Sequence, residues 1–144
     1  MPVRTLTLVL LCGILILGCD SAEDPAPELQ GRYEGTFTYI APPGPFSPGG
    51  PVSEAWVLML DENERGDVSG TGSLGDETPV TVSGRHDHPN VTLDFTDNDG
   101  DAAGRFTGTI SDDGRMLDGV YNVNIFFANN PVTLTRASAT LFFQ

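Results

Sequence analysis

Apolar and polar residues alternate along most of the chain after residue 30. In segment 33–39, aromatic residues and a glycine occupy every second position, with polar residues between them. Segment 91–95 repeats the pattern with Val91, Leu93 and Phe95. A period of two is typical of β-strands, in which successive side chains point to opposite faces. No stretch of this region keeps the period of about 3.6 residues of an amphipathic helix, so the pattern predicts an all-β domain.

Turn-forming residues divide this domain into short strands. Clusters of Gly, Pro, Asn and Asp fall at 62–66, 75–79, 86–90, 97–101, 111–114 and 128–131. Together with a longer, proline-rich connection at 41–53, they leave eight strands at even spacing. Short connections favour a meander, whereas a Greek-key sandwich needs a long crossover. We therefore expect an eight-stranded antiparallel up-and-down barrel, which leaves no exposed sheet edge.

The alternation alone does not define which face of the barrel is inside. An outer-membrane barrel has the same period, with its apolar residues facing lipid. Several predicted strands are shorter than the roughly 9 to 11 residues of a tilted transmembrane strand, and the aromatic residues form no paired girdles. We therefore expect a water-soluble barrel with an apolar interior.

Segment Gly70–Gly75 has the sequence GTGSLG, which matches the G-x-G-x-x-G pattern of dinucleotide-binding loops. That pattern holds pyrophosphate only where a helix begins at it, and here Asp-Glu-Thr-Pro and another strand follow. Glycine also recurs two residues after an apolar residue, as in Val68/Gly70 and Phe106/Gly108. We interpret these glycines as inward positions at which a strongly coiled sheet bends. GTGSLG is therefore expected to be part of a strand.

The start of the chain carries a targeting signal. Residues 6–17 form an apolar run that follows Arg4, too short to span a bilayer and typical of a signal-peptide core. The run ends in the letters ILGC, with Cys19 last, which resemble the lipobox of bacterial lipoproteins. The resemblance implies that Cys19 receives a diacylglyceryl group and becomes the N-terminus after cleavage. An ordinary secretory signal cut elsewhere is the alternative.

These signals divide the chain into three parts: a signal peptide at 1–18, the acylated Cys19 with a flexible tether at 19–30, and a barrel domain at 31–144. Cys12 would leave with the signal peptide, so no disulfide is expected. The expected location is the cell envelope, with the membrane contacted through acyl chains. The choice between inner and outer membrane stays open.

The charge balance excludes one class of partner. Twenty acidic residues face seven basic ones, all arginines, for a net charge of −13. Nucleic acid is not expected as a partner, because phosphate binding needs a basic surface. Electrostatic attraction to anionic lipid is equally disfavoured.

Two clusters could bind a metal. Asp97, Asp99 and Asp101 resemble part of a calcium loop, but the glycine comes too early and no bidentate Glu follows, so they are weak candidates. The same residues suit an ordinary hairpin turn. His86 and His88 could bind zinc or copper, but no Cys or third His accompanies them in the mature domain. We expect neither a metal nor a cofactor.

The predicted layout resembles that of the lipocalins and their relatives. That family opens with G-x-W on the first strand, has a long loop after it, and places an Arg from the last strand over the Trp. Here Tyr33 follows Gly31 at the Trp position, 41–53 matches the long loop, and Arg136 lies on the last predicted strand. The resemblance implies that Tyr33 and Arg136 form a pair that closes one end of the barrel.

Two functions are consistent with these patterns. No nucleophile elbow, zinc-protease motif or Ser/His/Asp arrangement is evident, so an enzyme is not expected. The first function is a lipocalin-like barrel that binds a small apolar ligand, with Phe37, Tyr39, Phe46 and Trp56 as the lining. The alternative is a structural or interaction lipoprotein with a filled barrel, which contacts an envelope protein. A large empty interior would favour the first function, and a packed one the second.

Overall fold

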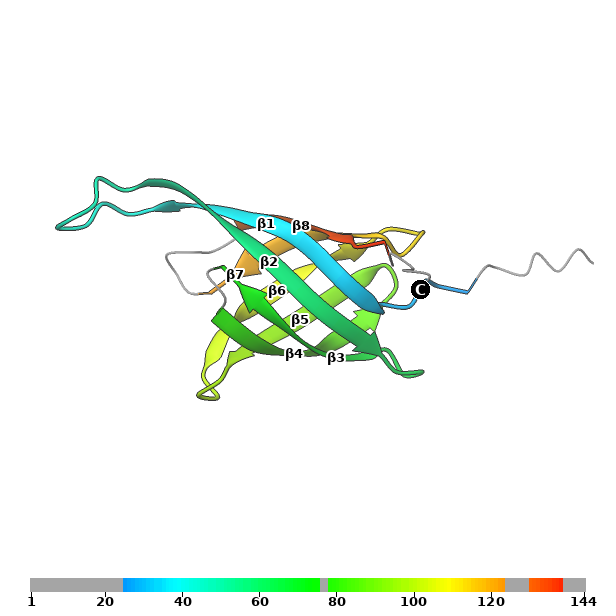
Figure 1. Cartoon of the computed structure of the whole chain (residues 1–144). Coiled ribbons are helices and arrows are strands. Elements are labelled where there is room, and N and C mark those ends of the chain that lie inside the picture. Colours follow the sequence, from blue (N-terminus) through cyan, green and yellow to red (C-terminus); the bar gives the residue numbers. More distant parts are fainter. Residues whose placement is uncertain (1–24, 76–77, 124–129, 139–144) are drawn as a thin grey trace, which may run out of the picture.

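A computed structural model describes residues 25–75, 78–123 and 130–138. Eight antiparallel strands follow one another in sequence order and close into a single barrel (Figure 1). The strands are β1 (Gly31–Ala41), β2 (Gly50–Glu62), β3 (Asp67–Leu74), β4 (Thr78–Asp87), β5 (Asn90–Asp97), β6 (Ala102–Ile110), β7 (Met116–Asn122) and β8 (Asn130–Arg136). The predicted all-β meander barrel is confirmed. Within the described residues, no helix has the length and apolarity needed to cross a membrane.

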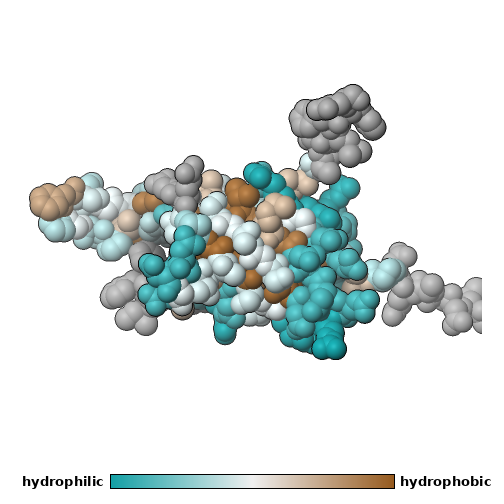
Figure 2. Space-filling model, turned by 60° about the horizontal axis from the view of Figure 1, so that its bottom comes forward, coloured by the Kyte–Doolittle hydropathy of each residue, from teal (hydrophilic) through white to brown (hydrophobic). Residues whose placement is uncertain are grey.

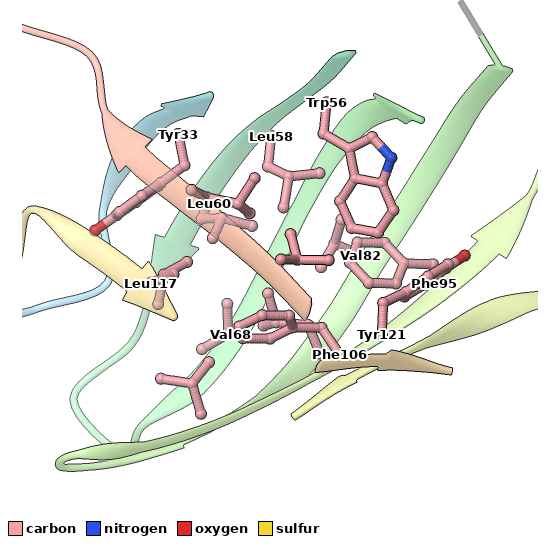
Figure 3. Close-up of a cluster of buried hydrophobic side chains, with 14 of the residues drawn as sticks. Tyr33, Trp56, Leu58, Leu60, Val68, Val82, Phe95, Phe106, Leu117 and Tyr121 are labelled. Atoms are coloured by element: carbon pink, nitrogen blue, oxygen red, sulfur yellow. The ribbon is translucent and has the colours of Figure 1, made fainter. Parts of the chain in front are cut away.

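The inward face of the strands is apolar, as predicted. Along β1, Tyr33 and Phe37 are buried, whereas Glu34, Thr36 and Thr38 between them are exposed. The other strands repeat this arrangement and supply Leu, Val, Ile and aromatic side chains to one continuous core, part of which is shown in Figure 3. Because the buried side chains of all eight strands meet in the interior, their packing holds the barrel together.

Inward glycines lie opposite large side chains on neighbouring strands. Gly72 faces Leu58 on β2, and a Cβ at Gly72 would lie 2.6 Å from Leu58 Cδ2. Gly108 and Gly119 face each other, and the ring of Phe106 occupies the space that their side chains would need. The first five residues of GTGSLG belong to β3, Gly75 lies in the turn after it, and the next element is β4. The expected strand is therefore found in place of a nucleotide-binding loop.

One end of the barrel, where β1 begins and β8 ends, is closed by the segment that precedes β1. We call it the closed end. Leu29 is fully buried there and belongs to the same core as the strand residues. Residues 19–30 were expected to be a flexible tether, but the packed domain includes Leu29. A single apolar residue among polar ones has too little pattern to be recognised from sequence.

At the opposite, open end, β1 and β2 continue beyond the barrel as a two-stranded arm, residues 40–51. Ala41 pairs with Gly50, and the same register continues to a bridge between Gly44 and Ser47. β1 pairs with β8 only up to Phe37, so among the described residues the arm has no neighbour on that side. Figure 1 shows it projecting from the barrel. The sequence predicts a long connection at 41–53, but cross-strand pairing continues into it, so β1 and β2 take up part of its length.

A glycine substitution tests the importance of the close contacts between strands. In Gly108→Ala, the new Cβ would lie against the Asp118 carbonyl oxygen and 2.7 Å from Gly119 Cα. Both neighbours are backbone atoms, so we expect the free energy of unfolding to fall by about 1 to 3 kcal/mol in urea denaturation. Gly44→Ala is the control, because no heavy atom lies within 4 Å of its Cβ position. Equal losses in both variants would contradict the packing argument.

Candidate ligand-binding pocket

The open end contains a cavity of about 230 Å³. The residues around it are Phe37, Tyr39, Glu54, Trp56, Leu74, Thr78, Val80, Ala103, Tyr121 and Val123. Most of them are apolar or aromatic, as in the binding sites of small molecules. The barrel interior is therefore filled toward the closed end and hollow toward the open end.

Aromatic rings form the walls of the cavity, with Trp56 at their centre. The centroid of Trp56 lies 4.6 Å from that of Tyr121 and 5.3 Å from that of Phe37. Phe95 packs edge to face against Trp56, with 5.7 Å between the ring centroids, and Tyr39 stacks on Phe37. Edge-to-face and stacked pairs are worth about 0.5 to 1.5 kcal/mol beyond burial alone. These contacts hold the cavity walls in place without a ligand.

Four polar side chains contribute to the cavity lining: Tyr39, Glu54, Thr78 and Tyr121. The Tyr39 hydroxyl donates a hydrogen bond to Glu54 Oε1 at 3.1 Å, and the Tyr121 hydroxyl donates to the Ala103 carbonyl at 2.5 Å. Burial raises the pKa of Tyr121 to about 12, and the charge of Glu54 adds to the increase. Burial also raises the pKa of Tyr39, helped by its hydrogen bond to Glu54. Both hydroxyls therefore stay protonated at neutral pH, and Glu54 is the charged side chain among the lining residues.

The indole nitrogen of Trp56 is a buried donor without an acceptor among the described residues. The side chain is 1% exposed. Figure 3 shows its nitrogen pointing to the same side as the Tyr121 hydroxyl, away from Tyr33 and Leu117. An unpaired buried N–H costs about 1 to 3 kcal/mol. This nitrogen is enclosed by protein atoms and has almost no surface open to the cavity.

The residues expected to line a pocket are only partly brought together. Phe37, Tyr39 and Trp56 lie in the cavity wall. Phe46 does not lie in the cavity wall, because its side chain is fully exposed at the tip of the arm. Glu54 and Tyr121 also line the cavity but were not among the predicted residues. The signal for Glu54 was its position two residues before Trp56, which places both side chains on the inward face of β2.

Tyr33 and Arg136 lie at the closed end, but only one of them is buried. The Tyr33 hydroxyl donates to the Gly114 carbonyl at 3.0 Å, and burial raises its pKa, an effect that the nearby charge of Arg136 partly offsets. The two residues are cross-strand partners. Arg136 is exposed, with its guanidinium beside Gly31. Arg136 therefore adjoins Tyr33 at the rim of the closed end and not in the core, because it is the last residue of β8.

A buried ionisable pair closes the same end and was not predicted. His86 Nδ1 lies 2.8 Å from Glu62 Oε2, and that oxygen also accepts the N–H of Leu29 at 2.6 Å. The His86 side chain is 3% exposed and that of Glu62 10%. Glu62 therefore ties the segment before β1 to β2 and β4.

The metal candidates have other roles in the structure. Asp97 Oδ1 accepts the N–H groups of Asp99 and Asp101, at 3.0 and 2.9 Å, and so stabilises its own turn. His86 and His88 lie with their rings 5.8 Å apart, but His86 contacts Glu62. Within 25–75, 78–123 and 130–138, no three His, Cys, Asp or Glu side chains are placed to hold a metal ion.

Removal of Glu62 tests its role as the tie at the closed end. Glu62→Ala leaves the Leu29 N–H and His86 Nδ1 without their acceptor, so we expect a loss of about 3 kcal/mol in the free energy of unfolding, measured by chemical denaturation. Glu64→Ala, two residues later in an exposed turn, should change it by less than about 0.5 kcal/mol. Similar results for the two variants would show that the pair does not hold the closed end.

Comparisons with protein-family models, with curated proteins and with solved structures find no match to this chain. The closed eight-stranded barrel is compatible with a lipocalin-like architecture. A function for the chain can therefore be based only on its own residues, above all those of the open end.

Proposed function

We propose that this chain is a membrane-anchored bacterial lipoprotein whose lipocalin-like barrel binds a small, mainly apolar ligand in the open-end cavity. The observation that carries the proposal is the cavity itself, which Trp56, Tyr121 and Phe37 wall with aromatic rings. Preformed aromatic walls with a few polar groups are the features that a binding site offers to a partly polar guest. The lipobox at Cys19 supports the anchor, and it lies outside the described residues.

The size of the cavity limits the ligand. Its volume of about 230 Å³ is below the roughly 300 to 1,000 Å³ typical of sites for drug-sized molecules. It exceeds the ~150 Å³ in which an apolar cavity accommodates benzene. A substituted single ring, or an aliphatic molecule of similar size, fits this range.

The arm favours a second function, in which the chain contacts an envelope protein. Phe46 at its tip is 101% exposed and Ile40 is 70% exposed. Figure 2 shows a hydrophobic tip at the end of the arm. Aromatic residues are enriched in protein–protein interfaces, so an exposed Phe46 on a protruding element is suited to a protein contact. This function needs no molecule in the cavity, so a ligand-binding experiment separates the two.

The ligand-binding proposal predicts saturable binding of a neutral probe, 2-phenoxyethanol. Trp56 is the single tryptophan of the chain and lines the cavity, so its fluorescence reports occupancy. For the full chain in phosphatidylcholine vesicles, we expect a saturable change in emission. Ala103→Leu fills the cavity and should weaken binding at least about tenfold, since overpacking removes the space that the probe needs.

Ala102→Leu is the matched control, because Ala102 is exposed on the neighbouring position of β6. It should leave the affinity unchanged. Native mass spectrometry of the purified protein would in addition detect a retained ligand. The absence of saturable binding and of any retained molecule would reject the ligand-binding proposal in favour of the protein contact.

The anchor is tested by Cys19→Ala. The acyl chains cannot be attached without the Cys19 sulfur, so we expect an unprocessed chain without the lipid-modified N-terminal peptide in mass spectrometry. The unchanged chain should be processed and should fractionate with membranes. A Cys19→Ala protein that is still found in membranes in a mature form would contradict the lipobox assignment.

A further inference from the structure

The carboxylate of Glu54 lies half-buried in the wall of an otherwise uncharged cavity. Its hydrogen-bond donor is the neutral Tyr39 hydroxyl, and the described part of the chain places no arginine in an ion pair with it. Partly buried charges are normally paired, since burial weakens their hydration. Glu54 therefore presents an uncompensated negative charge to a molecule in the cavity.

The arginines of the described chain are engaged elsewhere. Arg85 pairs with Asp67, and Arg105 contacts Asp94 through two hydrogen bonds, both on the outer face of the barrel. The remaining described arginines are Arg32, Arg65, Arg115 and Arg136, and all lie at the strand ends and turns of the closed end. The open end instead carries the aspartates of the turn 97–101. The resulting field attracts cations to the cavity mouth.

The aromatic walls add a second interaction with positive charge. The faces of Trp, Tyr and Phe rings carry a negative quadrupole, and cations within about 6 Å of a ring centroid are attracted to it. Trp56, Tyr121, Phe37 and Tyr39 all line the cavity with Glu54. A metal ion does not fit this wall, because hard cations require several oxygen ligands. An organic cation does, because it replaces its hydration with ring faces and one carboxylate.

Resting on the proposed ligand-binding function, we propose that the ligand of this cavity is a compact organic ammonium ion. Glu54 pairs with the ammonium group, and the rings enclose the apolar body. The cavity volume limits the size of the ligand, and the Glu54 carboxylate in addition selects a positive charge. The same carboxylate selects against anions.

The experiment compares three probes of one shape: 2-phenoxyethylamine, 2-phenoxyethanol and phenoxyacetate, which are positive, neutral and negative at pH 7. Each carries the same ether oxygen. Trp56 fluorescence is measured for the full chain in phosphatidylcholine vesicles, which have no net charge to concentrate the amine. We expect the amine to bind roughly fivefold or more tightly than the alcohol. Phenoxyacetate should show no saturable binding.

Glu54→Gln keeps the size of the side chain and removes its charge. In this variant, we expect the amine and the alcohol to bind within about twofold of each other, since a neutral amide contributes no charge attraction. Unchanged affinity for the alcohol shows that the cavity is intact. Glu64→Gln, at the closed end, removes the same charge away from the cavity and should keep the preference for the amine.

Equal affinities of the amine and the alcohol for the unchanged chain would overturn the cationic ligand and leave the proposed ligand-binding function standing. Tighter binding of phenoxyacetate would also overturn it. A preference for the amine that persists in Glu54→Gln would remove Glu54 from the site. No binding of any probe would overturn both proposals together.

Discussion

The structure depends on the narrow interior of a closed eight-stranded barrel. Such a barrel has too little space for a large side chain at every inward position. The chain meets this limit by placing glycine opposite leucine or phenylalanine on adjacent strands, as at Gly72 and Leu58. The strands then approach closely enough to complete the hydrogen-bonded ring. The aromatic cluster around Trp56 replaces this arrangement toward the open end, where rings that meet edge to face leave a cavity.

The two ends of the barrel use polar groups differently. At the closed end, Glu62 binds His86 Nδ1 and the backbone N–H of Leu29 in a buried position, so its carboxylate is used within the fold. At the open end, Glu54 accepts a hydrogen bond from Tyr39 and lies in the wall of the cavity. The candidate site is at the open end because the aromatic-walled cavity and this carboxylate occur together there.

The strands and part of the pocket could be predicted from local patterns in the sequence. A period of two and turn residues define the eight strands, and they also place Phe37, Tyr39 and Trp56 on inward faces. The contacts of Leu29, and of Glu62 with His86, join residues far apart in the chain, so no local pattern reveals them. The prediction that Phe46 lines the pocket was wrong, because the period of two does not define the direction of the arm. That direction is set by pairing between the two strands of the hairpin.

The arm has a different stability from the barrel on which it stands. Each barrel strand has two neighbours, but within 25–75, 78–123 and 130–138 the residues 40–51 pair only with each other. A two-stranded ribbon is marginally stable by itself, so the arm can open locally while the barrel stays closed. Its reach of about 20 Å, at roughly 3.3 Å per residue, is held by few interactions. Substitutions in the arm should therefore change the stability of the barrel little.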